Sequence, residues 1–168
     1  MPQTFTLIAS STVGSGGQAA IDFTSIPSTY TDLVLKLSAR ATSTNIDVKM
    51  NFNSITTGYS RRNLNGNGST VTSSSASDAW IGPIDGSGQT ANTFGNTEIY
   101  IPNYAGSTNK SYSIDSIVED NASLAYATFI AGLWSNTAAI TSISLSALSS
   151  SLTFAQYSTA YLYGIVKS

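Results

Sequence analysis

The chain has 168 residues, only 10% of them charged, and a formal net charge of −2 at pH 7. Globular proteins ordinarily contain about 25% charged residues, so this surface must consist mainly of hydroxyl and amide groups. The absence of cysteine and histidine excludes disulfides, thiolate chemistry, the commonest general base and the commonest zinc ligand. We expect one domain over residues 1–168, with a core that needs no covalent staples.

Basic residues are few and scattered, and Arg61-Arg62 is the only adjacent pair. Nucleic-acid binding requires clustered Lys and Arg, so we expect no nucleic-acid partner. No apolar run approaches the roughly 20 residues of a membrane helix. The first residues also lack the basic and apolar regions of a signal peptide. We therefore expect a protein that is made in a cytoplasm without a signal peptide and that has no membrane partner.

Apolar and polar residues alternate through most of the chain, and this period of two is typical of half-buried strands. In chain order, the alternation predicts strands at 4–9, 19–23, 33–40, 46–52, 59–64, 97–101, 111–118, 124–134, 143–147 and 159–166. Turn-forming residues separate them about every ten positions, and no helical spacing appears. This pattern predicts an all-β sandwich or barrel. We favour a jelly-roll-like antiparallel β-sandwich.

Three stretches carry more specific predictions. The strands Leu33–Ala39 and Ile46–Phe52 flank a polar stretch, which predicts an antiparallel hairpin with one face in the core. Two Asn-Gly steps at 65–68 predict a tight hairpin or a bulged turn, followed by a long Ser/Gly-rich excursion with short strand fragments. The longest apolar run, "LAYATFIAGLW" at 124–134, predicts a central strand that is buried on both faces.

Acidic residues offer only weak metal sites. Glu119-Asp120-Asn121 is the densest acidic point and suits either calcium or a hairpin turn, and we favour the turn because the ligand spacing of a calcium loop is missing. Asp85-Gly86-Ser87-Gly88 resembles half of a calcium loop, but one carboxylate is too few. We predict no metal and no cofactor.

The sequence shows no residue pattern that indicates an enzyme. Two carboxylates across a cleft would suit glycoside hydrolysis, but no spacing selects a pair from Asp78, Asp85, Glu98, Asp115, Glu119 and Asp120. A serine nucleophile would lack both the G-x-S-x-G turn and a histidine base, which leaves only an unsupported Ser–Lys dyad. We predict that the protein is not an enzyme and has no catalytic residues, with a polysaccharide hydrolase as a remote alternative.

Aromatic residues supply the candidate binding residues. Tyr59, Trp80, Tyr100, Tyr104 and Tyr157 lie among Asn and Gln residues, which suits either a subunit interface or stacking against a sugar. We favour the interface, and we expect Trp80 to be more exposed than Trp134. Arg61-Arg62 suits an ion-paired contact with a partner subunit. The predicted interface residues are Tyr59, Arg61, Arg62, Trp80 and Tyr104.

Four stretches carry a resemblance: "SIPSTYTDLVLKLSAR", "FGNTEIYIPNYAGSTNKS", "AGLWSNTAAITSISL" and "FAQYSTAYLYGI". Their sequences and their order along the chain resemble a family of small virion proteins of tailed phages, which is known mainly from marine and cyanobacterial phages. The resemblance covers most of the chain and implies a structural protein of the particle surface. It implies no catalytic residues.

Within that setting the first expectation is a capsid decoration (cement) protein that binds the assembled shell and stabilises it by mass action at many sites. Its partner would be the major capsid protein or another virion protein, and we expect a homo-oligomer, with a trimer favoured. The alternative is a head- or tail-fibre module that binds host-surface carbohydrate.

Overall fold

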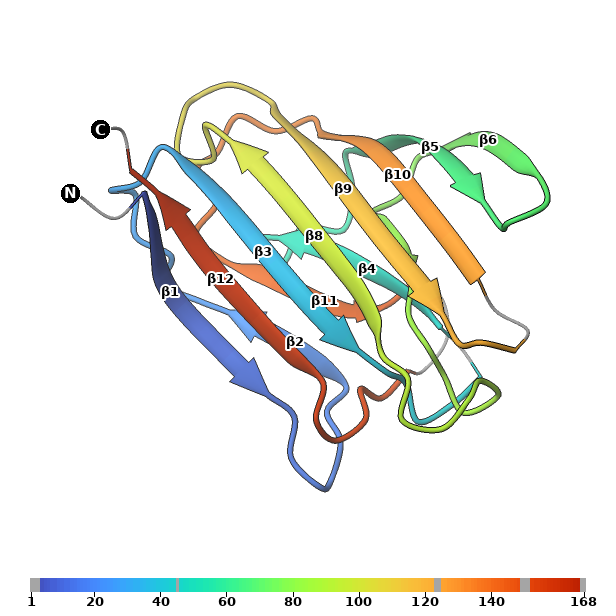
Figure 1. Cartoon of the computed structure of the whole chain (residues 1–168). Coiled ribbons are helices and arrows are strands. Elements are labelled where there is room, and N and C mark those ends of the chain that lie inside the picture. Colours follow the sequence, from blue (N-terminus) through green and yellow to red (C-terminus); the bar gives the residue numbers. More distant parts are fainter. Residues whose placement is uncertain (1–3, 45, 123–124, 149–151, 167–168) are drawn as a thin grey trace.

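The computed structural model describes residues 4–44, 46–122, 125–148 and 152–166, which form twelve β-strands and no helix (Figure 1). The prediction of an all-β protein is thus confirmed. Among these residues no helix suited to crossing a membrane is found. The strands are β1 (Phe5–Thr12), β2 (Ala20–Phe23), β3 (Asp32–Ala39), β4 (Asp47–Phe52), β5 (Tyr59–Gly66), β6 (Val71–Ala76), β7 (Trp80–Pro83), β8 (Gly95–Pro102), β9 (Lys110–Glu119), β10 (Ala125–Trp134), β11 (Ile143–Ala147) and β12 (Thr159–Ile165).

Two antiparallel sheets pack face to face. The larger sheet has eight strands in the order β1-β12-β3-β8-β9-β10-β5-β6, and the smaller has four in the order β2-β11-β4-β7. In Figure 1 the larger sheet lies in front and the smaller sheet lies behind it. The protein is therefore a β-sandwich whose larger sheet extends beyond the smaller one.

Strand pairing follows one simple rule when the hairpins β5–β6 and β9–β10 are set aside. The eight remaining strands pair first with last, as β1·β12, β2·β11, β3·β8 and β4·β7. They form one long antiparallel ribbon that folds over, so that its pairs alternate between the two sheets. The two hairpins extend the larger sheet beyond β8 at one edge.

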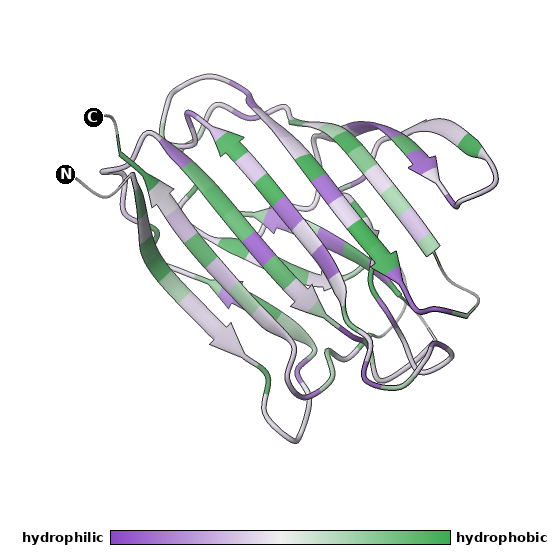
Figure 2. Ribbon diagram, viewed as in Figure 1, coloured by the Kyte–Doolittle hydropathy of each residue, from purple (hydrophilic) through white to green (hydrophobic). Residues whose placement is uncertain are grey.

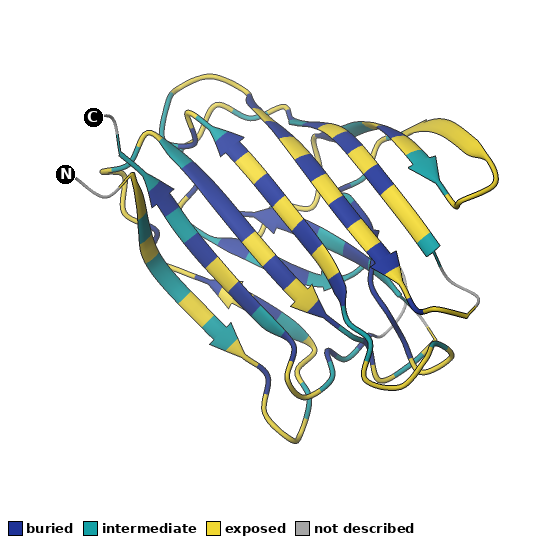
Figure 3. Ribbon diagram, in the orientation of Figure 1, coloured by how far each residue is buried: buried dark blue, intermediate teal, exposed yellow. Residues whose placement is uncertain are grey.

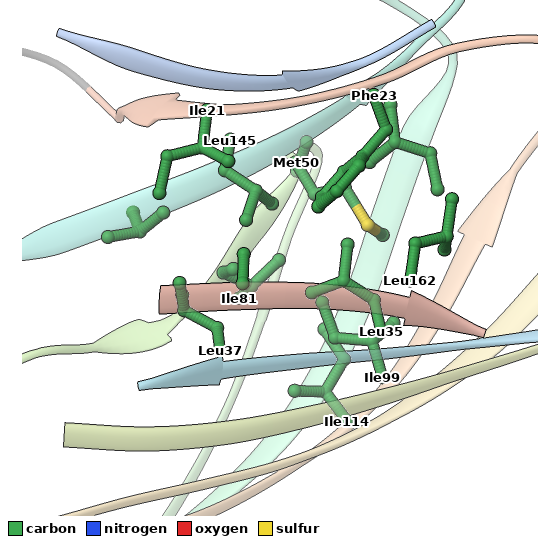
Figure 4. Packing of buried hydrophobic residues seen from close by; sticks show 14 of the residues in the cluster. Ile21, Phe23, Leu35, Leu37, Met50, Ile81, Ile99, Ile114, Leu145 and Leu162 are labelled. Carbon is green, nitrogen blue, oxygen red and sulfur yellow. The ribbon is translucent and has the colours of Figure 1, made fainter. Parts of the chain in front are cut away.

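The hydrophobic core lies between the sheets. Side chains of the two sheets meet there: Leu35, Ile99 and Leu162 of the larger sheet face Met50 and Leu145 of the smaller sheet (Figure 4). All five side chains are fully buried. Each large apolar side chain buried in this way stabilises the fold by about 2 kcal/mol. The inward-facing residues are those that the alternation predicted.

The predicted hairpin between Leu33–Ala39 and Ile46–Phe52 is wrong. β3 lies in the larger sheet between β12 and β8, whereas β4 lies in the smaller sheet between β11 and β7. The segment between them crosses from one sheet to the other, and its backbone donates from Ala41 to Asp85 and from Thr42 to Thr153. Both strands still point their apolar side chains into the core, because alternation determines the buried face but not the partner strand.

The prediction that residues 124–134 are buried on both faces is also wrong. In β10 (Leu124 lies outside the described residues) only the inward side chains such as Ile130 and Trp134 are buried, whereas Ala127, Phe129 and Ala131 are exposed. Figure 3 shows the same alternation of buried and exposed residues along β8, β9 and β10. The smaller sheet covers one face of this strand, and nothing described covers the other.

The hairpin predicted from the Asn-Gly steps at 65–68 is confirmed, but its turn lies at 67–70, because Asn65 and Gly66 still belong to β5. β5 and β6 pair antiparallel up to Gly66 and Val71, and the side-chain Oδ1 of Asn67 accepts hydrogen bonds from the backbone N–H groups of Ser69 and Thr70. Gly68 has a φ of 85°, which glycine adopts without strain. The excursion that follows contributes β6 and β7.

Candidate functional site

Polarity is inverted where the larger sheet extends past the smaller one. On β5 and β10, Leu64 and Phe129 face solvent and are 52% and 57% exposed. The neighbouring positions Asn63 and Thr128 are turned inward and buried. A sheet with one solvated face ordinarily shows the opposite arrangement. This inversion singles out the β5–β6 extension as the part of the fold that departs from simple core formation.

The outward side chains form what we call the apolar patch: Leu64, Val71, Ile117 and Phe129. Val71 and Ile117 are 76% and 47% exposed. Phe129 stands directly opposite Leu64 on the neighbouring strand, and Ile117 stands opposite the small, exposed Ala127. The patch therefore continues across β9, β10, β5 and β6, and Figure 2 places apolar residues on these strands.

A shallow, open hollow of about 670 Å³ adjoins the patch. Its outward-facing lining comes from Arg62, Leu64, Ser73, Ser75, Ser113 and Phe129. Large contiguous apolar areas on a soluble protein mark interaction surfaces more often than chance. Of this lining, Arg62 and Phe129 are residue types that protein interfaces favour, whereas the serines are types that interfaces contain less often.

A charged strip lies beside the patch on the same face. Lys36 of β3 pairs with Glu98 of β8 at 2.7 Å, and Asp115 of β9 stands opposite Glu98. Beyond this strip, the far edge of the sheet exposes Phe5 and Leu7, which are 52% and 51% exposed. The outer face is thus apolar at both ends and charged in the middle.

Two of the predicted interface residues are core residues. Tyr59 is 4% exposed and Tyr104 is 0% exposed. The ring of Tyr59 stacks on Trp134 at a centroid distance of 6.1 Å, and its hydroxyl accepts a hydrogen bond from the Phe52 N–H. The Tyr104 hydroxyl donates to the Pro27 carbonyl. Because neither side chain reaches the surface, neither belongs to a contact surface of this structure.

Arg61 and Trp80 come together beside Asp78. The Arg61 guanidinium lies over the Trp80 ring, 4.6 Å from the centroid, and donates from Nε to Asp78 Oδ1 at 2.6 Å. Burial would raise the pKa of Asp78, but the hydrogen bonds from Arg61 and the Trp80 backbone, with the Arg61 charge, lower it overall. The cation of Arg61 is thus used within the chain. Trp80 is half-buried and Trp134 is fully buried, as predicted.

Arg62 lies on the other face of β5 from Arg61, because successive residues of a strand point to opposite faces. Its side chain is exposed and lines the hollow. Among the described residues it has no carboxylate partner, and its guanidinium donates to the carbonyl of Arg61. Of the five predicted residues, Arg62 alone joins the apolar patch.

The acidic candidates cap turns or lie buried. Glu119 Oε1 accepts from the Asn121 N–H, and Asp120 Oδ1 accepts from the Ala122 N–H, as in the turn that we favoured. Asp85 is 0% exposed, and burial raises the pKa of its carboxyl. The part of the chain that the structure describes holds no group of three or more His, Cys, Asp or Glu side chains suited to a metal.

Sequence reasoning missed the apolar patch itself. Its signal was the run at 124–134, whose residues are apolar at both odd and even positions. Such a run suits a strand that is buried twice, but equally a strand with one core face and one contact face. Only the tertiary structure separates the two, because it shows that no described element covers the outer face of β10.

Comparisons with models of protein families, with curated proteins and with solved structures found no match for this chain.

Proposed function

We propose that this protein is a structural component of a tailed-phage particle, and specifically a capsid decoration protein that docks its outer sheet face onto the shell. The observation that carries the proposal is the apolar patch beside Arg62. Four large apolar side chains stay about half-exposed or more together at one end of the outer face. Covering them is the gain that a partner offers.

The shape of the face supports a broad protein partner. The patch and the charged strip lie on adjacent strands of one continuous sheet, so one flat contact would span both. At about 25 cal/mol per Å2 of apolar area, covering residues such as Phe129 and Val71 favours binding. Repetition over a particle multiplies this modest gain, which suits a cement protein.

The framework supports the proposal as well. We infer that the eight-stranded ribbon is a jelly roll, because its strands pair first with last and alternate between the sheets. Jelly rolls occur in viral capsid proteins among others, so the fold alone does not decide the function. The resemblance of the four stretches to virion proteins of tailed phages points to the same setting, with the major capsid protein as the partner and a trimer as the oligomer.

Copy number on the particle tests the proposal. We expect a cryo-EM reconstruction of the phage that encodes this chain to show its density repeated over the capsid lattice. We also expect particles that lack the protein to lose their DNA at a lower temperature. Density at a few copies on the tail or on a vertex fibre would contradict a decoration role.

The docking face is tested with variants. The double variant Leu64→Ser, Phe129→Ser removes two exposed side chains, so the protein should fold while its binding to stripped particles falls about tenfold or more. The matched control is Tyr157→Asn, which removes a 70% exposed aromatic outside the patch at a φ of 72° that asparagine tolerates. Equal binding by the double variant and the wild type would place the contact elsewhere.

A further inference from the structure

We infer that a cleft on the inner side of the β5–β6 extension binds a neutral saccharide. The cleft has a volume of about 380 Å³, within the range of about 300–1,000 Å³ of small-molecule sites. The polar and aromatic residues that line it are Asp47, Asn65, Thr72, Trp80, Tyr126 and Thr128. These residues come from β4, β5, β6, β7 and β10, so the fold assembles the site from five strands.

The cleft exists because the larger sheet outgrows the smaller one. β7 is the last strand of the smaller sheet, whereas the larger sheet continues to β5 and β6. Figure 1 shows the β5–β6 hairpin projecting at that end of the sandwich. The inner face of this overhang therefore has no apolar layer opposite it, and Asn65 and Thr72 stand there as cross-strand neighbours.

Two polar atoms beside the cleft lack partners. The Oδ1 of Asn65 and the Oγ1 of Thr128 are buried without a hydrogen bond among the described residues, and Thr128 is 1% exposed. A buried polar atom without a partner is destabilising, because it has lost its hydrogen bonds to water and gained none in exchange. Because Thr128 and Asn65 both line the cleft, hydroxyl groups of a bound ligand would supply the missing partners.

Trp80 is held rigidly in the wall of the cleft. Its indole Nε1–H donates to Asp47 Oδ1 at 2.7 Å, and its backbone N–H donates to Asp78 Oδ1 at 3.1 Å. Arg61 covers its ring from 4.6 Å. Because Arg61 already lies over the ring, a ligand would contact the part of the indole that lines the cleft. A side chain fixed in this way loses little conformational entropy on binding, which is the advantage of preorganisation.

The chemistry of the lining selects the ligand class. No described lysine or arginine lines the cleft, and the nearby Arg61 is already paired with Asp78, so the site offers no free cation to a phosphate, sulfate or carboxylate. The rings of Trp80 and Tyr126 offer apolar surfaces, while amide, hydroxyl and carboxylate groups offer hydrogen bonds. A neutral sugar presents both C–H faces and hydroxyls, and so matches both parts of the lining.

The cleft and the apolar patch are separate sites on opposite faces of the same strands. Asn65 points into the cleft, whereas its neighbour Leu64 belongs to the patch. Saccharide binding therefore does not rest on the decoration role, and either proposal can fail without the other.

A glycan array displays the probes for a first test, with the biotinylated full chain presented on streptavidin so that weak contacts add. The array carries neutral, sulfated and uronic-acid-containing oligosaccharides. We expect binding to neutral oligosaccharides only. The neutral glycan with the strongest signal is then titrated into 15N-labelled protein, where the indole N–H resonance of Trp80 should shift and that of the buried Trp134 should not.

Two variants and a neighbouring control locate the site. Trp80→Ala should weaken binding about thirtyfold or more. Thr72→Ala, at an exposed edge position that folding does not need, should weaken it about two- to tenfold. The control is Ser73→Ala, one residue further along β6 and facing the outer hollow, which should leave the affinity unchanged.

The proposal is overturned by any of three results. They are a wild-type protein that binds no neutral glycan on the array, a preference for anionic glycans, and affinities for Thr72→Ala and Ser73→Ala that do not differ. Loss of particle binding by the patch variant, with glycan binding intact, would support two independent sites.

Discussion

Asp85 is a carboxyl group that the fold buries without hydrogen-bond partners for either oxygen among the described residues. Burial raises its pKa above the ordinary value of 3.8, and the positive charge of Arg40 and the nearby Thr93 side chain oppose this only in part. The folded protein therefore holds this proton more tightly than the unfolded chain does. The free energy of unfolding must then fall as the pH rises through the raised pKa, and it stays lower at neutral pH.

Replacing this carboxyl with its amide tests that account. We expect Asp85→Asn to raise the free energy of unfolding at pH 7 by about 1 kcal/mol, because it removes a buried charge of the same shape. The gain should vanish below pH 3.8, where the wild-type carboxyl is protonated in both states. Urea denaturation across this pH range measures it, and a gain of equal size at pH 3 would contradict a titration effect.

Gly132 lies at a position where the surrounding structure has no room for a larger side chain. A Cβ at this position of β10 would overlap the ring of Tyr112, whereas a Cβ at Gly66 meets nothing within 4 Å. We expect Gly132→Ala to lower the free energy of unfolding by about 2–3 kcal/mol through overpacking. Gly66→Ala should leave it unchanged or raise it slightly. Chemical denaturation compares them, and equal stabilities would mean that the Tyr112 ring moves aside freely.

At the scale of strands, the sequence pattern predicted buried faces well and partners poorly. The inward residues Leu35 and Met50 follow from alternation alone, since a strand has only two faces. Their strands pair in different sheets because the segment after Arg40 bonds to distant backbone at Asp85 and Thr153. Such long-range bonds leave no trace in the local sequence, so a hairpin was the natural prediction.

The inner face of β3 gives a direct test of that reasoning. Leu35→Asp places a charge in the core at a residue that is 0% exposed, and we expect it to prevent folding, because an unpaired buried charge costs more than the fold can supply. Ser38→Asp, on the exposed face of the same strand, should change the stability by less than about 0.5 kcal/mol. Far-UV circular dichroism and soluble yield distinguish them, and a folded Leu35→Asp protein would place this strand at an edge of the core.

The candidate site depended on features that only the whole molecule shows. Tyr59 and Trp80 are both aromatic residues with polar neighbours in the sequence. Tyr59 stacks on Trp134 in the core, whereas Trp80 lines a cleft. Phe129 is a surface residue because it points to the outer face of the larger sheet, which no described element covers. The residue types suited binding, and the face on which each side chain lies, together with what covers that face, decides which of them are accessible.

The low charge of the whole molecule sets how its docking should respond to salt. Only 10% of the residues are charged, and the contact that we propose centres on apolar side chains, whose burial salt does not screen. We expect the affinity for stripped particles to change less than about threefold between 50 and 500 mM NaCl. Sedimentation of particles with bound protein measures this.

Arg62 is the residue that would make binding depend on salt. If its exposed guanidinium paired with a carboxylate of the shell, binding would weaken steeply as salt screens the pair. The Arg62→Gln variant separates the two cases, because it keeps most of the side-chain length and removes the charge. A steep salt dependence in the wild type that disappears in Arg62→Gln would show that charge, and not the apolar patch, holds the protein on the particle.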